Sequence, residues 1–489
     1  MKKEISLGLM AFLLASCTVG PDYHRPQIYR DEEISKNLGL NPAQRTPVAK
    51  DWYKQFNDPV LNELVALSLK DSPDVKIAVQ KLRQARNEFD INAFNFFPMI
   101  DVDGSYHYNK PSRKIGYTID TDYYQTGLDA SWELDIWGGG RRLNESQQAL
   151  MKAAAADLNN VYVSLAAETA ADYITLRSLQ VQLKIAEQNL ELQQKIYDIV
   201  KRKNQVGLED DVALNQAKYA IESTRTLIPD LQQNISEARN ALAILTGRLP
   251  GQLDELLVDR NKNLVRRRFN FELGKIYEQP ASVIRNRPDV QVAEQQLIAQ
   301  NALVGQEISK LFPNVSLSGF LGFQALEVSG LVGSKTFMYT YSPAVTLPLL
   351  HWGQLQNQVE LQKNVTLEYF YRYQNSILSA AEEVKNAMTS IGNEYKKNLS
   401  AYEAASSQKK ATTLILEKYK RGLIEFNDVL TAEQNLLSAQ NNLAASNGKI
   451  YQTLIAYYKA VGGGYAHNAP EFCMLYKSSL LNGTPCSAL

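Results

Sequence analysis

Residues 124–136 read YQTGLDASWELDI, a strict alternation of mainly apolar and polar side chains. A period of two is that of a β-strand whose faces meet different surroundings, and Asp129, Glu133 and Asp135 all fall on the polar face. A tilted strand needs about 9–11 residues to cross a bilayer, so this segment is long enough. We expect one face to meet lipid and the other water. A soluble, half-buried antiparallel sheet is the alternative.

Three further segments have the pattern of strands. Residues 315–324 and 337–347 alternate clearly, and residues 100–108 do so less regularly, with Tyr106 and Tyr108 suited to a membrane interface. A membrane barrel needs about eight or more strands, and open strand edges are not tolerated in lipid. Several copies of the chain must therefore share one barrel, and three copies of four strands would supply twelve.

The chain repeats itself at an offset of 215 residues. The anchors that share this offset are Pro73-Asp74-Val75 with Pro288-Asp289-Val290, Phe97-Pro98 with Phe312-Pro313, Trp137-Gly138 with Trp352-Gly353, Gly207 with Gly422, and Ala217 with Ala432. We therefore divide the chain into two repeats, residues 66–250 and 281–465, joined by a charged linker over residues 251–280. Each repeat is predicted to contain a helix, two strands and a long helix pair.

The long helices are indicated by missing prolines. No proline occurs in residues 112–228 or 349–469, and leucines recur there at the three- and four-residue steps of a coiled-coil seam. Gly207 and Gly422 interrupt the two regions and are predicted to form the turns of two antiparallel hairpins, at the same end and far from the strands. The predicted helices span about 140–205, 210–245, 353–420 and 427–461.

Both ends of the chain carry cysteines. Residues 1–16 have the basic start and short apolar run of a secretory signal, and Leu14-Ala15-Ser16-Cys17 is similar to a bacterial lipobox. We expect Cys17 to carry lipid and residues 17–65 to form a lipid-anchored segment. An ordinary cleaved signal with an incidental cysteine is the alternative. In the tail, residues 466–489, Cys473 and Cys486 form either a disulfide or two free thiols.

The composition argues against several classes of function. The 489 residues carry 52 Lys plus Arg and 52 Asp plus Glu, so no net charge draws the chain to nucleic acid. Three Cys and four His, none at metal-ligand spacing, argue against a metal site. Carboxylate pairs such as Asp101 and Asp103 have no His or nucleophile motif nearby, and no phosphate-binding glycine loop is present. We expect transport without catalysis or a cofactor.

A set of motifs then carries a family resemblance. The motifs are Cys17 with Val19-Gly20-Pro21-Asp22-Tyr23 and Pro26, Arg287-Pro288-Asp289-Val290, Phe312-Pro313, Leu347-Pro348-Leu349 with Trp352-Gly353, and Ala460-Val461-Gly462-Gly463-Gly464-Tyr465. In this order, over almost the whole mature chain, the sequence resembles the TolC-type outer-membrane efflux channels, in their lipid-anchored multidrug branch. The resemblance implies an α+β membrane protein. Its trimer would have a shared twelve-strand barrel, a long α-helical coiled-coil tunnel and a mixed equatorial region.

The resemblance also implies where the functional residues lie. A periplasmic gate would involve Tyr419, Asn427, Asp428 and Thr431. Asp428 takes the first acidic gate position, whereas Thr431 replaces the second acid, so a double acidic ring is not expected. The residues expected to meet an adaptor at the helix tips are Gly207, Glu209, Asp210, Asp211, Arg421 and Gly422. Helix capping is the alternative role for Asp210 and for Asp428.

The function implied is that of an exit duct. A homotrimer in the outer membrane of a Gram-negative bacterium would pass drugs and other toxic small molecules passively from the periplasm to the exterior. Its partners would be outer-membrane lipid, a periplasmic adaptor of the membrane fusion protein type, and an inner-membrane pump of the proton-driven RND type. No nucleic acid partner is expected. A metal-ion or protein-secretion duct on the same fold, or a structural coiled-coil lipoprotein, are the alternatives.

Overall fold

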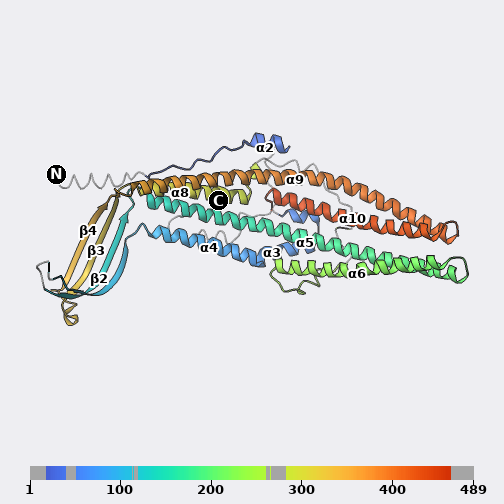
Figure 1. The fold of residues 1–489 in the computed structure, drawn as a ribbon, viewed down its shortest axis with the longest axis horizontal. Helices are drawn as coiled ribbons and strands as arrows, with labels where there is room; N and C mark the ends of the chain where they lie inside the picture. The colour runs from blue at the N-terminus through green and yellow to red at the C-terminus, as the bar shows by residue number, and fades with distance from the viewer. Residues whose placement is uncertain are drawn as a thin grey trace. The chain divides into compact units, whose positions relative to one another are not determined.

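The computed structural model describes residues 18–39, 51–112, 114, 119–259, 265 and 282–463 (Figure 1). It divides into two compact units. The first comprises Met1–Pro26, Lys81–Ala155 and Val292–Asn375, and the second comprises Gln27–Gln80, Ala156–Gln291 and Ser376–Leu489. Cys17, Cys473 and Cys486 lie outside the described residues, so the expected lipid attachment and disulfide stay predictions.

The first unit contains one antiparallel sheet in the order β1-β2-β3-β4. Its strands are β1 (Met99–Asn109), β2 (Thr121–Leu134), β3 (Asn314–Ala325) and β4 (Phe337–Thr346). Leu128 pairs with Val102 on one side and Leu321 on the other, so apolar side chains share one face. Val102 is 82% exposed and Tyr341 74% exposed. The four predicted strands are confirmed, and their apolar face is uncovered within one chain.

Four long helices follow the strands. They are α5 (Gly139–Gln205), α6 (Asp211–Leu245), α9 (Trp352–Lys420) and α10 (Phe426–Ala460), which confirms the four predicted segments. The 67 residues of α5 correspond to about 100 Å of helix. In the described part of the chain, no helix combines the length and apolar character needed to cross a membrane.

The shorter helices differ from the expectation. A single helix is expected at the start of each repeat, but the structure has α3 (Pro59–Asp71) and α4 (Pro73–Phe94) in the first, and α7 (Ser282–Arg285) and α8 (Pro288–Ser309) in the second. Pro73 and Pro288 begin the later helix of each pair. The proline ring disfavours helical geometry in the preceding residue and suits the first helical turn, which explains both breaks. A further helix, α2, spans Asp31–Leu38.

Arg287 joins three helices of the second unit. Its guanidinium donates to the Ala460 carbonyl, to Asp289 and to Glu383, each at 2.7 Å. The residue is 6% exposed, so these partners replace the water that a buried cation loses. Arg287 therefore fixes the start of α8 against α9 and the end of α10.

Candidate functional site

The two long hairpins end in the same turn. Gly207 follows α5 and Gly422 follows α9, both in the left-handed region at φ 74°. The next amide returns to the carbonyl of Lys203 at 2.8 Å in the first turn and of Lys418 at 3.0 Å in the second. A Cβ at either glycine would meet open space, so backbone conformation and not crowding selects glycine. Both turns lie at the same end of the hairpins (Figure 1).

The helices that leave these turns are capped differently. The Asp210 carboxylate accepts a hydrogen bond from the Ala213 amide at 2.8 Å and caps α6. The residue at the same place in the second repeat is Glu425, which makes no capping hydrogen bond to α10. The capping role anticipated for Asp210 is therefore the one seen here. Asp211 lies beside it and accepts a hydrogen bond from Asn204 at 3.1 Å.

Tyr419 connects the two tips. Its hydroxyl donates to the Glu209 carboxylate at 2.8 Å, across from α9 to the α5–α6 turn. Lys203 donates to the Tyr419 carbonyl at 2.9 Å, and its ammonium lies 3.7 Å from the centre of the Tyr419 ring. Lys203 also lies 3.9 Å from Glu209. We call these three residues the tip link.

The tip link rests on an apolar cluster. Tyr419 is 1% exposed. Burial, together with the hydrogen bond to Glu209, raises the pKa of Tyr419 above its ordinary value, so the hydroxyl keeps its proton and donates. The buried members of the cluster are Ile196, Val200, Ala213, Ala217, Tyr419, Phe426 and Val429. Side chains from α5, α6, α9 and α10 therefore meet in one packed layer beneath the tips.

The other predicted gate residues lie on the surface. Asn427, Asp428 and Thr431 are exposed in the first turns of α10. Thr431 donates from its hydroxyl to the Asn427 carbonyl at 2.9 Å. Among the described residues, Asp428 takes part in no hydrogen bond or ion pair, so it does not cap α10. The four predicted gate residues thus separate into an exposed group and the buried Tyr419.

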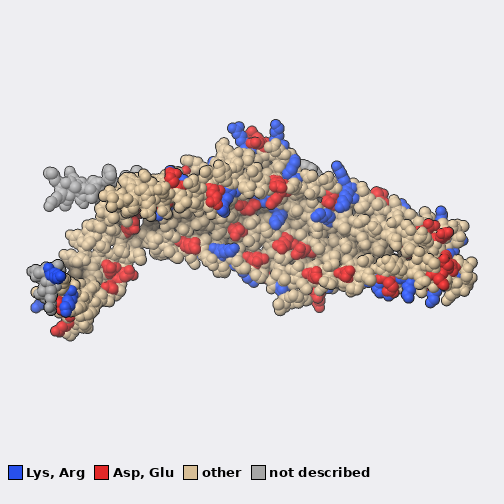
Figure 2. Space-filling view, viewed as in Figure 1, with Lys and Arg blue, Asp and Glu red and all other residues tan. Residues whose placement is uncertain are grey.

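Charged side chains of both signs gather at the hairpin ends (Figure 2). Arg421 and Glu425 are both exposed at the α9–α10 turn. A polar rim of mixed sign suits a reversible contact with another protein.

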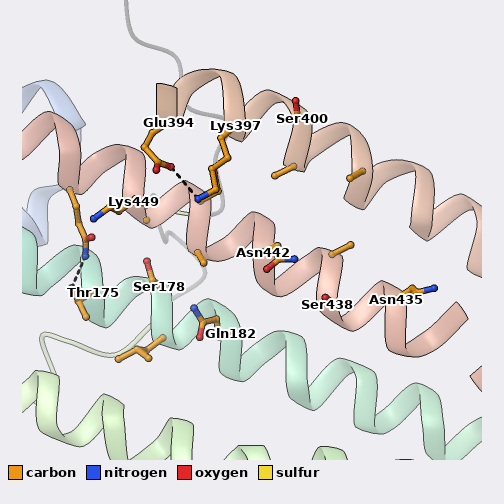
Figure 3. Close-up of a pocket in the computed structure, with 18 residues that line it drawn as sticks. Thr175, Ser178, Gln182, Glu394, Lys397, Ser400, Asn435, Ser438, Asn442 and Lys449 are labelled. Carbon is orange, nitrogen blue, oxygen red and sulfur yellow. Dashed lines mark hydrogen bonds and ion pairs between the residues drawn. The ribbon is translucent and has the colours of Figure 1, made fainter. Parts of the chain in front are cut away.

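A groove of about 920 Å³ opens beside α10 between α5 and α9 (Figure 3). Its walls are mostly small or neutral polar side chains. They are Thr175, Ser178, Leu179 and Gln182 of α5; Glu394, Lys397, Ser400, Ala401 and Ala404 of α9; and Asn435, Ser438, Ala439, Asn442, Ala445, Ser446, Gly448, Lys449 and Gln452 of α10. Lys397 and Glu394 form an ion pair at 3.7 Å.

One polar stripe joins the groove to the tip. Between Asp428 and Lys449, exposed residues of α10 recur at steps of three or four, which places them on one helix face. They are Thr431, Asn435, Ser438, Asn442 and Ala445. The stripe covers about 30 Å of helix. Glu433 lies between these positions in the sequence, but it is 3% exposed and does not belong to the stripe. The stripe is therefore uncharged between its ends.

Sequence reasoning missed two of these features. Lys203 was not anticipated, and Tyr419 and Glu209 were assigned separate roles at the gate and the adaptor surface. At the offset of 215 residues, Tyr419 corresponds to Asn204 of the first repeat. This replacement of a short amide by a long aromatic side chain is the sequence signal that distinguishes the two tips. Asn and Gln residues are frequent in α10, but only burial shows which of them are exposed on one face.

The chain is similar to known efflux proteins over most of its length. The model of one family, described as outer membrane efflux protein, matches residues 64–248 and 280–463. Toluene efflux pump outer membrane protein TtgC of Pseudomonas putida is 25% identical over 479 residues, 95% of this chain and 96% of that protein. Cation efflux system protein CusC of Escherichia coli is 26% identical over 464 residues, 93% of this chain and 98% of that protein. The solved outer-membrane channel OprN is 31% identical with a TM-score of 0.83, over 92% of this chain and 99% of OprN.

Proposed function

Because this chain belongs to the outer membrane efflux protein family and is an outer-membrane efflux channel, we propose that three copies form the exit duct of a tripartite pump. The duct passes drugs and other toxic small molecules passively from the periplasm to the exterior. It acts as a conduit and not as an enzyme. The single observation that carries this proposal is the uncharged polar stripe of α10, which leads from the helix tip into the groove.

The stripe suits conduction better than retention. Amide, hydroxyl and methyl groups hydrogen-bond or contact many solutes weakly, and a duct must release each solute that enters. A wall of this kind gives no strong preference for one chemical class. Specificity then belongs mainly to the pump and adaptor, and energy comes from the pump, for which we propose the proton-driven RND type.

The tip link supports a gate at the periplasmic end. Tyr419 holds the α9–α10 tip to the α5–α6 tip through Glu209 and Lys203. An adaptor that binds the mixed charges around Arg421 and Gly422 would favour an open arrangement in which this link is separated. Asn427, Asp428 and Thr431 would then line the aperture, with one acidic residue per copy.

The sheet supports assembly in the membrane. In the described chain β1 and β4 each pair on one side only, so each strand offers an unpaired edge to a neighbouring copy. Three copies would join edge to edge into one closed wall with the apolar face toward lipid. We propose that lipid on Cys17 adds a second anchor in the outer membrane.

The groove favours organic cargo over metal ions. Copper and silver prefer thioether, thiolate and imidazole ligands, whereas Ser, Asn, Gln and Ala line the groove. TtgC is described as part of a toluene efflux pump and CusC as part of a cation efflux system, so the family includes both types of transport. The side chains of the stripe suit the passage of uncharged and organic solutes better than the binding of metal ions.

A growth panel on a deletion strain tests the proposal. We expect deletion to sensitise cells to hydrophobic drugs, dyes and bile salts, and the intact gene to restore growth. Sensitisation to copper and silver salts alone would replace the proposal with metal-ion efflux. Loss of a secreted protein without any change in drug tolerance would replace it with protein secretion.

A further inference from the structure

The head of the groove carries a cation, Lys449. Lys449 is exposed on α10, and no hydrogen bond or ion pair engages its ammonium among the described residues. Lys397 extends from the neighbouring helix α9 into the same region (Figure 3). Lys397 is 67% exposed, and its charge is offset by Glu394 at 3.7 Å. Among the described residues, the groove head therefore has one uncompensated positive charge per chain.

The floor beside Lys449 combines close packing with apolar surface. A Cβ on Gly448 would lie 2.0 Å from the Ser178 hydroxyl oxygen, so α10 approaches α5 here as only glycine allows. The small apolar groups on the groove wall are Leu179, Ala401, Ala404, Ala439 and Ala445. A charged group at one end and methyl groups along the wall match a ligand with an acidic head and an apolar body.

We propose that the head of this groove binds amphiphilic organic anions, with Lys449 holding the carboxylate or sulfonate group. This inference rests on the proposed duct, because in a trimer three copies of Lys449 would form a cationic ring inside the passage. Asp428 at the opposite end of the stripe would form an acidic ring about 30 Å away. The passage would then have one positively charged section and one negatively charged section. Neither anionic nor cationic solutes would be held along its whole length.

The chemistry of Lys449 fits a transient anion site. An ammonium on a flexible stem is a mobile point charge that follows a passing anion, whereas a guanidinium would form a bidentate and longer-lived pair. The wide groove keeps the ammonium hydrated, which weakens each contact and favours release. Lys449 is thus a specificity-determining residue for anionic cargo.

Planar-bilayer recordings of the purified full-length trimer test this inference. Pyrenesulfonate is the probe anion and pyrenemethylammonium the matched cation, and the quantity measured is the concentration that halves the conductance. The variants are Lys449→Gln and Lys449→Arg. Lys410→Gln is the control, since Lys410 is exposed on α9 nine residues after Ala401 and therefore lies on the opposite side of that helix. Each variant is also recorded with Asp428→Ala, so that the acidic tip does not exclude the anion first.

We expect Lys449→Gln to raise the half-blocking concentration of pyrenesulfonate about tenfold, the loss typical of one charged contact. Lys449→Arg and Lys410→Gln should retain the block by pyrenesulfonate. Block by pyrenemethylammonium should not weaken in any lysine variant. Equal pyrenesulfonate block in Lys449→Gln and Lys410→Gln would overturn the anion site while leaving the duct intact. Absence of any pore from the wild-type trimer would instead overturn the duct.

Discussion

The two helix tips are built on one repeat unit but are held in different ways. In the α5–α6 tip, Asn204 donates to the Glu209 carbonyl and to the Asp211 carboxylate, both at 3.1 Å, and Asp210 caps the next helix. In the α9–α10 tip, Tyr419 stands at the position of Asn204, and its hydroxyl bonds to Glu209 of the other tip. The first tip is stabilised by hydrogen bonds among its own residues, whereas the second is stabilised by a hydrogen bond to the first.

In the proposed gate, this difference indicates which hairpin would move. Separating the second tip from the first breaks two hydrogen bonds, a cation–π contact and the packing of an aromatic ring, but leaves every internal bond of the first tip in place. A gate built this way has a fixed part and a mobile part, joined at one residue.

The largest effect should come from Tyr419→Ala. Removing a buried aromatic side chain typically costs about 3–5 kcal/mol, and here the loss falls on the contact between the tips. We expect the resting pore to leak, seen as higher single-channel conductance and as uptake of large antibiotics that the intact outer membrane excludes. Asn204→Ala at the matched position should not leak. A resting conductance equal to that of wild type would show that the tips are held by something else.

Glu433 should make the second hairpin sensitive to pH. Burial raises the pKa of Glu433 to about 7, and no charged partner contributes to the shift. Below about pH 4.5 the carboxyl is protonated in both folded and unfolded chains, and as pH rises the unfolded chain loses its proton first. Folding stability should therefore fall between about pH 4.5 and 7, by up to about 3 kcal/mol, and level off above.

Glu433→Gln is the test of that pH dependence. The variant should unfold at a higher temperature than wild type at pH 8, and the two should agree near pH 4. The matched control is Lys218→Gln, since Lys218 holds the same place in the first repeat and is exposed on α6. If wild type and Glu433→Gln differ equally at both pH values, ionisation of this carboxyl is not the cause.

A smaller effect isolates the hydrogen bond of the tip link. Tyr419→Phe and Glu209→Gln should be non-additive, with a coupling energy of about 1–2 kcal/mol for a bond to a charged acceptor. Hydrogen exchange at the start of α10 measures it, because opening of the tip exposes those amides. Additive effects would mean that packing alone joins the two tips.

The smallest effect compares the two caps. Asp210→Ala should destabilise the start of α6 by about 1 kcal/mol, whereas Glu425→Ala should leave α10 within about 0.5 kcal/mol. Hydrogen exchange at the first amides of each helix measures both. Equal losses in the two variants would contradict the asymmetry of the tips.

Much of this fold could be predicted from local patterns. The alternation in residues 124–136 and the missing prolines in two long regions are properties of neighbouring residues, and they led to β2 and to the four long helices. The offset of 215 residues led to matched turns at Gly207 and Gly422. Two helix boundaries were missed, because the breaks before Pro73 and Pro288 were merged into continuous helices.

The sequence by itself therefore determined the period of each element, the repeat and the turns. Only the tertiary structure decided which side chains meet across those elements. Tyr419 and Glu209 lie 210 positions apart, and their hydrogen bond depends on how two hairpins pack. The same packing buries Glu433 and leaves Lys449 exposed, although both lie on one helix. Burial and long-range contact follow from the placement of whole helices, which no local period encodes.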